Sequence, residues 1–415
     1  MSLKKKGILS GSFMKINLLM LVFMLTAPQV FAEEIYVWSR AAWSEFMVQE
    51  FNKKMKSEGK DITAVNNLVG YDDYQTKLTA ALSAGQQVDI ANIDLVNVPH
   101  YSELQAFVDM TDFLKGKDYY EQLSKPMMHL GEWEGKQFAA PNAADVSALA
   151  YNKKLLKKHG FDGPPKNYAD MITQCKAFAD AGELYFSWPA KHGGGMIFTF
   201  QPWAWANGGE WVSKDGKKMM VNNPKTREVY AHFRQMMDIG CVPKNVSSMD
   251  WQENQDLWLN TKIAIVGTGN FMVKAIKEHL DKVDPGFTPF FSKDGSRISG
   301  FIGGDLIAVP VTTGNSEAAF EYVNFVLSKY GQVEVSTKSG SIPIRNDLYE
   351  GNPYLSENSM VFARAMQAGD CPKTVVWQEL VDPWKITNER IFSGEDIDTV
   401  LKEQQAAMQK IIDDH

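Results

Sequence analysis

The sequence has few of the residues on which covalent and metal chemistry depends. Only three of its 415 residues are cysteines, Cys175, Cys241 and Cys371, and no two of them form a C-x-x-C pair. A zinc-binding or thioredoxin-like protein is therefore not indicated. In an oxidising compartment two of the cysteines can pair, but the odd count and the wide spacing leave the pairing open.

Catalytic signatures are also missing. The chain contains no G-x-S-x-G, H-E-x-x-H, P-loop or G-x-G-x-x-G pattern, and its seven histidines are scattered. The stretch DWQENQD at 250–256 imitates the start of an EF-hand loop but lacks the central glycine and the final glutamate, so a solvated helix face explains it better. We predict no catalytic residues, no metal site and no cofactor. A carboxylate pair for glycoside hydrolysis stays open, because such pairs meet in space rather than in sequence.

One apolar segment near the N-terminus is too short to cross a membrane. Four lysines lie before or at the edge of the apolar segment 16–25, and Val-Phe-Ala at 30–32 places small or tolerated residues before Glu33. This order is typical of a secretory signal peptide, which we expect to occupy residues 1–32 and to be cleaved. A spanning helix needs about 20 apolar residues, and an uncleaved anchor is the alternative. No cysteine follows the segment, so we expect no lipid anchor; Met1 and Met14 are alternative starts.

The remaining chain is acidic and long. Removing four lysines from 43 Lys and Arg leaves 39 against 50 Asp and Glu, a formal net charge of −11. An acidic surface argues against nucleic acid or an anionic membrane as a partner. The 383 residues after the cut exceed what one hydrophobic core usually serves, so we predict two domains.

Strand and helix signals alternate along the chain. A strand at 35–38 precedes a helix whose apolar residues recur every four positions from Trp43 to Met55. A second helix stops at Gly85, before a strand at 88–93. Further helices are predicted at 153–159, 167–182 and 223–240, and further strands at 263–266 and 306–309. This order predicts an α/β fold with a parallel sheet, and the lack of a flexible linker predicts that the chain crosses between its domains more than once.

Aromatic residues gather in stretches that look like loops. The segments are FTFQPWAWANGGEW (198–211), VVWQELVDPWK (375–385) and IVGTGNF (265–271). Flat rings beside amides and carboxylates suit a carbohydrate, because a pyranose has an apolar C–H face for stacking and hydroxyls for hydrogen bonds. The alternative, that the rings attach loops to the core, is better for any single ring. For the aromatic residues of the three segments taken together, we favour carbohydrate binding.

An ordered series of segments resembles a known family. The segments are DDYQTKLTAALSAGQQVDI, EWEGKQFAAPNAADVSALAYNKKLL, PPKNYADM, the Gly-Gly loop at 208–209, LWLNTKIAIVGTGNF, GFIGGDLIAVP and SGSIPIRNDLYE. Together they resemble the extracellular solute-binding proteins (family 1) that bind sugars for ABC importers, the family of maltose-binding protein. The similarity covers the whole chain after the signal peptide. Gln87 stands where the family commonly has a proline before an aspartate, and Ser39-Arg40 departs from the family too, which leaves the sugar open.

This resemblance implies the two-lobed periplasmic-binding-protein fold (type II-like), with a ligand cleft between lobes joined by hinge crossings. It assigns 33–144 with about 286–327 to the first lobe, and 145–285 with about 328–415 to the second. Residues 141–152 would form the first crossing, which places Asp145 at the mouth of the cleft. There its carboxylate can accept two hydroxyl hydrogen bonds. A helix cap or a hinge salt bridge is the alternative.

The resemblance also suggests ligand contacts position by position. Those residues are Trp38, Ser39, Arg40, Trp43, Asp94, Asn97, Asp145, Trp203, Phe271, Gly304, Asp305 and Trp384. Three of them have structural alternatives: Trp43 fits the apolar face of its helix, Gly304 fits a turn, and Arg40 can pair with an acid across the cleft.

These expectations define a function and two rivals. We expect a monomeric periplasmic protein, not an enzyme, that captures a mono- or oligosaccharide or a polyol by hinge closure for the permease subunits of an ABC importer. One rival is the same fold with a polyamine, a phosphorylated polyol or a metal ion as ligand. The other is a secreted carbohydrate-active enzyme. The sugar, its length and the cognate permease stay open.

Overall fold

A long mixed sheet runs through both halves of the computed structural model, which describes residues 33–351 and 355–415. The predicted signal peptide lies outside the described residues. The strand order is β2-β1-β3-β12-β6-β8-β7, with β9 paired to β6. These strands are β1 (Glu33–Ser39), β2 (Ile62–Leu68), β3 (Ile90–Asp94), β6 (Ala139–Asn152), β7 (Phe186–Ser187), β8 (Ile265–Gly269), β9 (Pro285–Thr288) and β12 (Ile302–Ala308). Two short hairpins lie outside the sheet, β4 (Glu132–Trp133) with β5 (Lys136–Gln137) and β10 (Phe290–Phe291) with β11 (Ile298–Ser299).

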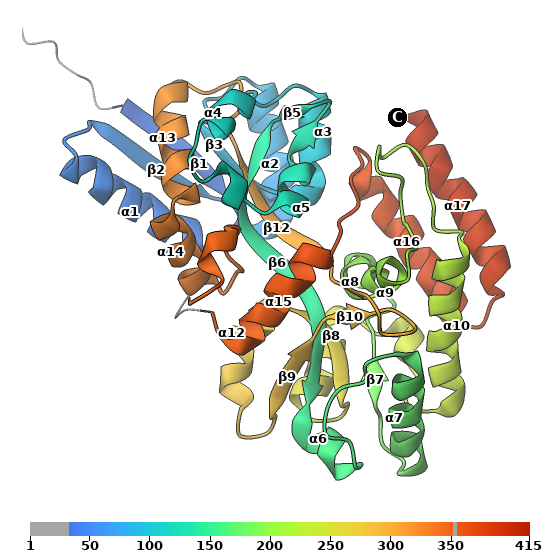
Figure 1. Ribbon diagram of the computed structural model, residues 1–415. Coiled ribbons are helices and arrows are strands. Elements are labelled where there is room, and N and C mark those ends of the chain that lie inside the picture. The colour runs from blue at the N-terminus through green and yellow to red at the C-terminus, as the bar shows by residue number, and fades with distance from the viewer. Residues whose placement is uncertain (1–32, 352–354) are drawn as a thin grey trace, which may run out of the picture.

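The predicted two-lobed α/β fold is confirmed (Figure 1). The first lobe carries α1 (Trp43–Ser57), α2 (Tyr71–Ser83), η1 (Leu95–Asn97), α3 (Val98–Glu103), α4 (Thr111–Lys115), η2 (Tyr120–Gln122), α5 (Lys125–Leu130), α13 (Ser316–Leu327), α14 (Lys329–Ser339) and η5 (Asn346–Leu348). The second lobe carries α6 (Lys153–Lys158), α7 (Tyr168–Asp180), α8 (Gly193–Thr199), α9 (Gln201–Ala206), α10 (Pro224–Ile239), η3 (Val246–Ser248), α11 (Trp251–Leu259), α12 (Phe271–Ala275), η4 (Ile276–His279), α15 (Glu357–Ala368), α16 (Trp377–Phe392) and α17 (Ile397–Asp414).

The strand β6 belongs to both lobes. Its first half, from Ala139 to Val146, pairs with β12, and its second half, from Ser147 on, pairs with β8 and β9. Figure 1 shows β6 passing from one lobe to the other with β12 beside it. Because α14 packs against α1 in the first lobe while α15 packs against β9 in the second, the chain crosses a third time between these helices. The prediction of repeated crossings is therefore confirmed.

The sheet is mixed, whereas the sequence predicts a parallel one. The strand β1 pairs in parallel with β2 and β3, as expected where helices connect successive strands. The strand β12 runs antiparallel to both β3 and β6. Since β6 leaves the first lobe and β12 returns to it, the two crossings run in opposite directions, and antiparallel pairing follows.

Two segments lie in a different lobe from the one that we predict. The strand β9 pairs with Leu149–Asn152 of β6, so the segment that begins near 286 packs with the second lobe until β12 returns. The helix α14 packs against α1 in the first lobe, although we predict the second lobe from about 328. Only Ser328 separates α13 from α14, so the chain has no room to cross at that point.

Local sequence signals explain where several helices begin and which face they bury. Asn167 accepts a hydrogen bond from Asp170 N at the start of α7, and Asn223 accepts from the first turn of α10. In α1 the side chains of Phe51 and Met55 are fully buried, as the four-residue spacing predicts. These short-range patterns set where the helices begin and which face each packs against its own lobe.

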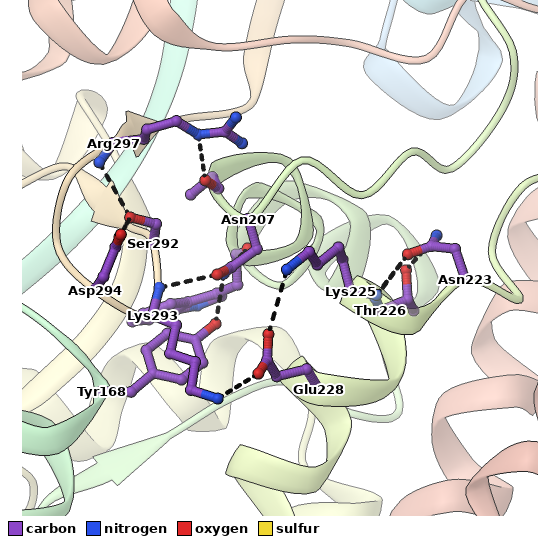
Figure 2. Close-up of polar contacts among 12 residues, drawn as sticks. Tyr168, Asn207, Asn223, Lys225, Thr226, Glu228, Ser292, Lys293, Asp294 and Arg297 are labelled. Carbon is purple, nitrogen blue, oxygen red and sulfur yellow. Dashed lines mark hydrogen bonds and ion pairs between the residues drawn. The ribbon is translucent and has the colours of Figure 1, made fainter.

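The aromatic segment 198–211 forms the end of helix α8, helix α9 and the following turn. Arg297 holds the end of α9, because its guanidinium donates to the carbonyl oxygens of Trp205 and Ala206, each at 2.8 Å. Asn207 donates to Tyr168 Oη at 3.0 Å, and Figure 2 shows these side chains at the end of the helix. The polar contacts tie the turn to the second lobe.

Cys175 and Cys241 form a disulfide bond that joins α7 to the segment after α10, with the two Cα atoms 5.4 Å apart. Cys371 is a buried free thiol. The structure thus decides the pairing that the sequence leaves open.

We predict that removing this disulfide destabilises the second lobe. The bonded cysteines are 66 residues apart in sequence, and loop-closure entropy sets an upper estimate of about 4 kcal/mol for the contribution of the bond to the free energy of unfolding. Denaturant unfolding of the Cys175→Ser/Cys241→Ser double variant, compared with Cys371→Ser, measures this contribution. A double variant that unfolds at the wild-type midpoint would contradict the prediction.

Candidate functional site

A cavity of about 680 Å³ lies where the two lobes meet. The first lobe and the crossings contribute Arg40, Asp94, Val96, Asp145, Phe301, Gly303 and Gly304 to its lining. The second lobe contributes His192, Gly194, Gly195, Phe198, Trp251, Phe271, Trp377, Gln378 and Val381. A ligand in this cavity would contact both lobes at once.

Charged side chains form the wall that the first lobe contributes. Arg40, directly after β1, pairs through Nη1 with Asp94 at 3.0 Å and through Nη2 with Asp305 at 2.6 Å. Asp94 ends β3 and Asp305 lies in β12, so three neighbouring strands place these groups together. The guanidinium is thereby fixed between two carboxylates, each largely removed from water.

Asp145 lies in β6, where the first half of this strand meets the second. Asn270 Nδ2 donates to its carboxylate at 3.3 Å, while Asn270 Oδ1 accepts from Val146 N at 2.6 Å. Burial and the nearby Asp305 carboxylate raise the pKa of Asp145 to about 6, against the opposing effects of Asn270 and Arg40. The carboxylate therefore stands in the cavity wall with too few donors to offset its charge fully.

Aromatic rings form the opposite wall, on the second lobe. The ring centroid of Trp251 lies 6.0 Å from that of Phe198 and 6.3 Å from that of Phe271, both in edge-to-face contact. Phe198 also contacts Phe301, with centroids 5.4 Å apart. Phe271 keeps 38% of its surface exposed, which leaves its ring accessible to a ligand in the cavity that it lines.

Two glycines let the backbone come close at this site. Gly304 has φ +114°, and a Cβ there would lie 2.0 Å from the carbonyl oxygen of Ala143, so no other residue fits β12 at this point. A Cβ at Gly195 would lie 2.9 Å from the Trp251 ring. The alternative that we give for Gly304, a turn, is wrong, because Gly304 lies within β12, where its backbone conformation requires glycine and its position lines the cavity.

A smaller cavity adjoins the first. It occupies about 430 Å³ on the first lobe and shares Arg40, Asp94 and Gln378 with the larger cavity. Gln378, at the start of α16, donates through Nε2 to Asn97 Oδ1 at 3.0 Å. This hydrogen bond connects the two lobes beside the cavity.

The structure brings some of the predicted contact residues to the cavity. Arg40, Asp94, Asp145, Phe271 and Gly304 line it. Two more lie beside it: Asp305 is bonded to Arg40, and Asn97 lines the smaller cavity.

Five other predicted residues lie away from the cavity. Trp203 and Trp384 are fully buried in the second lobe, where Trp203 packs among phenylalanines such as Phe291, with centroids 4.9 Å apart. Trp38 and Ser39 are buried, and Trp43 packs partly buried against the core of the first lobe. For the four tryptophans, the alternative that the rings pack against the core describes their burial.

The sequence interpretation misses several residues of the wall. Trp251 follows Asp250, which caps α11, and we assign that stretch to a solvated helix face. Two sequence signals point toward the missed residues, the His-Gly-Gly-Gly run at 192–195 and the tryptophan next to a cap. Neither pattern shows which face meets the other lobe, since this depends on how the lobes pack.

The fold and this bipartite cavity can be compared with known proteins. The family model of the bacterial extracellular solute-binding protein matches residues 38–333. This chain belongs to that family. Members are binding proteins, and the resemblance that the sequence motifs suggest is confirmed.

Several relatives of this solute-binding protein cover most of its length. The diacetylchitobiose-binding protein DasA of Streptomyces coelicolor is 26% identical over 81% of this chain and 78% of its own length. A binding protein of Brucella abortus is 24% identical over 88% of this chain and 89% of its own length.

Solved structures share the fold of this solute-binding protein. The cyclic α-maltosyl-1,6-maltose binding protein of Arthrobacter globiformis gives a TM-score of 0.81 at 19% identity, covering 92% of this chain and 99% of that one. The sugar-binding protein MalE of Xanthomonas citri gives 0.82 at 16% identity, covering 92% and 98%.

Two further features bear on other kinds of site. Among residues 33–351 and 355–415, no helix combines the length and the apolar character that crossing a bilayer requires. In the same residues, no group of three or more His, Cys, Asp or Glu side chains is arranged to hold a metal ion.

We predict that Asp145→Asn stabilises the ligand-free protein at pH 7. The folded-state pKa of Asp145 is raised to about 6 from an ordinary value of 3.8, so folding favours the protonated form and the ionised carboxylate lowers stability. The cost is absent below about pH 4, grows between about pH 4 and pH 6, and is constant above that range at no more than about 3 kcal/mol. Thermal unfolding of both proteins from pH 4 to 8 measures the difference.

The exposed Asp281 provides the matched control, because Asp281→Asn makes the same change of charge away from the cavity. Parallel pH profiles for wild type and Asp145→Asn would show that Asp145 is not held in an unfavourable ionised state.

Proposed function

We propose that this protein captures a carbohydrate in the interlobe cavity and presents it to an ABC importer, without chemical change to the ligand. The observation that carries the proposal is the division of the cavity into an aromatic wall and a charged wall. Rings such as Trp251 and Phe271 can stack on the C–H face of a pyranose, while Asp145 and Arg40 can exchange hydrogen bonds with its hydroxyls.

The relatives support this assignment through what their names state. DasA binds diacetylchitobiose, a relative in Pyrococcus abyssi binds maltotriose, and the Arthrobacter protein binds a cyclic maltosyl-maltose. Because each of these ligands is a saccharide, a saccharide is the first ligand class to test here.

Among the sequence-predicted residues, we propose Arg40, Asp94, Asp145, Phe271 and Gly304 as ligand contacts, with Asp305 and Asn97 in support. The structure adds Phe198, Trp251, Phe301 and Trp377 from the same lining. Trp38, Ser39, Trp43, Trp203 and Trp384 are assigned instead to the packing of the lobes.

Binding would act through closure of the lobes. A ligand that touches both walls binds the closed arrangement better than the open one and therefore increases its population. The antiparallel pair β6 and β12 can act as the hinge, because both strands pass between the lobes side by side. Rotation of the lobes then requires changes in the backbone angles of only a few residues of these strands. The permease would distinguish the closed form from the open one.

The proposed location is the periplasm, reached through a cleaved signal peptide at residues 1–32, with the mature protein a monomer. The disulfide between Cys175 and Cys241 supports an oxidising compartment. The acidic composition supports a small-molecule partner rather than nucleic acid.

We predict that a saccharide from a broad panel raises the melting temperature, as ligand binding to the native state requires. Phe271→Ala should weaken binding of that saccharide about tenfold, which corresponds to about 1.4 kcal/mol of lost stacking. Calorimetric titration measures the dissociation constant of the saccharide for the wild type and for Phe271→Ala. Tyr330→Ala is the matched control, since this exposed ring lies on α14, outside the cavity lining.

Melting curves that stay unchanged across monosaccharides, oligosaccharides and polyols would contradict the proposal. Release of reducing ends from a glycan would instead support the carbohydrate-active enzyme, in which Asp145 with its raised pKa would be the natural candidate for a general acid.

A further inference from the structure

The interlobe cavity contains more negative than positive charge. Among the described residues that line it, the charged side chains are Arg40, Asp94 and Asp145, and Asp305 is bonded directly to Arg40. One guanidinium therefore faces three carboxylates. His192 also lines the cavity, but its Nδ1 accepts a hydrogen bond from Gly195 N, a role open only to an unprotonated nitrogen.

The single guanidinium is shared by two of the three carboxylates. Arg40 contacts Asp94 at 3.0 Å and Asp305 at 2.6 Å, whereas the hydrogen bond to Asp145 is a neutral amide contact from Asn270 at 3.3 Å. Burial raises the pKa of Asp94 even with Arg40 beside it, and burial and Asp305 raise the pKa of Asp145. The site therefore carries an excess of charge that a partner of opposite sign would relieve.

The aromatic wall is compatible with such a partner. A cation is attracted to the face of an aromatic ring, and indole attracts it most strongly. Trp251 and Phe271 contact each other edge to face, so their planes are inclined by 61° and present two differently directed surfaces. One surface can take the C–H face of a sugar ring and the other a charged substituent.

We infer that the ligand is a cationic amino sugar, whose pyranose ring lies against Trp251 and Phe271 and whose ammonium group pairs with Asp145. This inference rests on the proposed function and narrows its ligand class. A neutral sugar can donate hydroxyls to Asp145, but it leaves the excess of negative charge in place. An ammonium group removes part of that excess and also satisfies the carboxylate, because charge-assisted hydrogen bonds are the stronger kind.

Binding of the amine should depend on pH through Asp145. The groups around it are Asp305 on β12, Asp94 on β3, Arg40 after β1, His192 before α8 and the neutral Asn270. As the pH falls below 6, Asp145 takes up a proton and its attraction for an ammonium group weakens. A neutral sugar loses less binding affinity at low pH, since a protonated carboxyl group still forms hydrogen bonds with its hydroxyls.

Matched ligands that differ in one substituent test the inference. Glucosamine, N-acetylglucosamine and glucose form one series of free amine, acetylated amine and neutral sugar. Two further series have the same three forms, one built on galactose and one on the β-1,4-linked glucose disaccharide. Calorimetric titration at pH 7 should give the free amine at least tenfold tighter binding than its acetylated and neutral analogues in the series that binds. At pH 5 this preference should shrink.

Variants of the protein show whether Asp145 causes the preference for the amine. Asp145→Asn should weaken both kinds of ligand but reduce the amine preference to threefold or less, because the amine loses a charge pair whereas a neutral sugar loses only the charge assistance of its hydroxyl hydrogen bonds. Asp281→Asn, a change of equal charge on the surface, should leave the preference intact. Neutral or acetylated sugars that bind as tightly as the amine would overturn the inference and leave the proposed function standing. If no member of these series and no saccharide of the broad panel binds, the proposed function itself fails.

Discussion

The antiparallel pair of β6 and β12 is the constraint on which the rest of the structure depends. These strands are the first two connections between the lobes, and they pair along the first half of β6. Their pairing places Asp145 opposite Gly303 and brings Asp305 beside β3, so that groups far apart in sequence share one wall. The same pairing requires Gly304, since any side chain there would separate the strands.

The cavity has a charged wall from the first lobe and an aromatic wall from the second, and neither lobe supplies both. The first lobe holds a guanidinium between two carboxylates at strand ends, where α/β folds commonly bind their ligands. The second lobe supplies rings that keep part of their surface outside its own core, above all Phe271. Each wall on its own leaves one group incompletely satisfied: the Asp145 carboxylate accepts a single amide hydrogen bond from Asn270, and the Phe271 ring keeps part of its surface exposed. A molecule with hydroxyls or an amine on one side and an apolar face on the other would satisfy both.

Much of this architecture can be predicted from the sequence, and the limits are physical. Helix caps such as Asn167 and Asn223 and the apolar spacing of α1 are local, so the sequence predicts them well. The place of Asp145 in a crossing strand is implied by the resemblance to the family, and the cost of an unpaired acid in a core agrees with it.

The orientation of the aromatic rings and the course of the chain at the hinge depend on distant contacts. Trp203, Trp377 and Trp384 occur in the same kind of segment and are all buried, yet of the three only Trp377 lines the cavity, because the direction of a side chain on a helix depends on what packs against that helix. The side of the hinge on which α14 lies likewise depends on contacts with α1, to which the local sequence gives no guide.

The central claim is that one ligand lies between the charged wall and the aromatic wall. A crystal structure of the protein with a saccharide selected by calorimetry tests it most directly. The account predicts electron density for a pyranose ring against Trp251 and Phe271, with a polar substituent within hydrogen-bonding distance of the Asp145 carboxylate. Density for the saccharide on the outer surface of either lobe, with the interlobe cavity containing solvent alone, would contradict it.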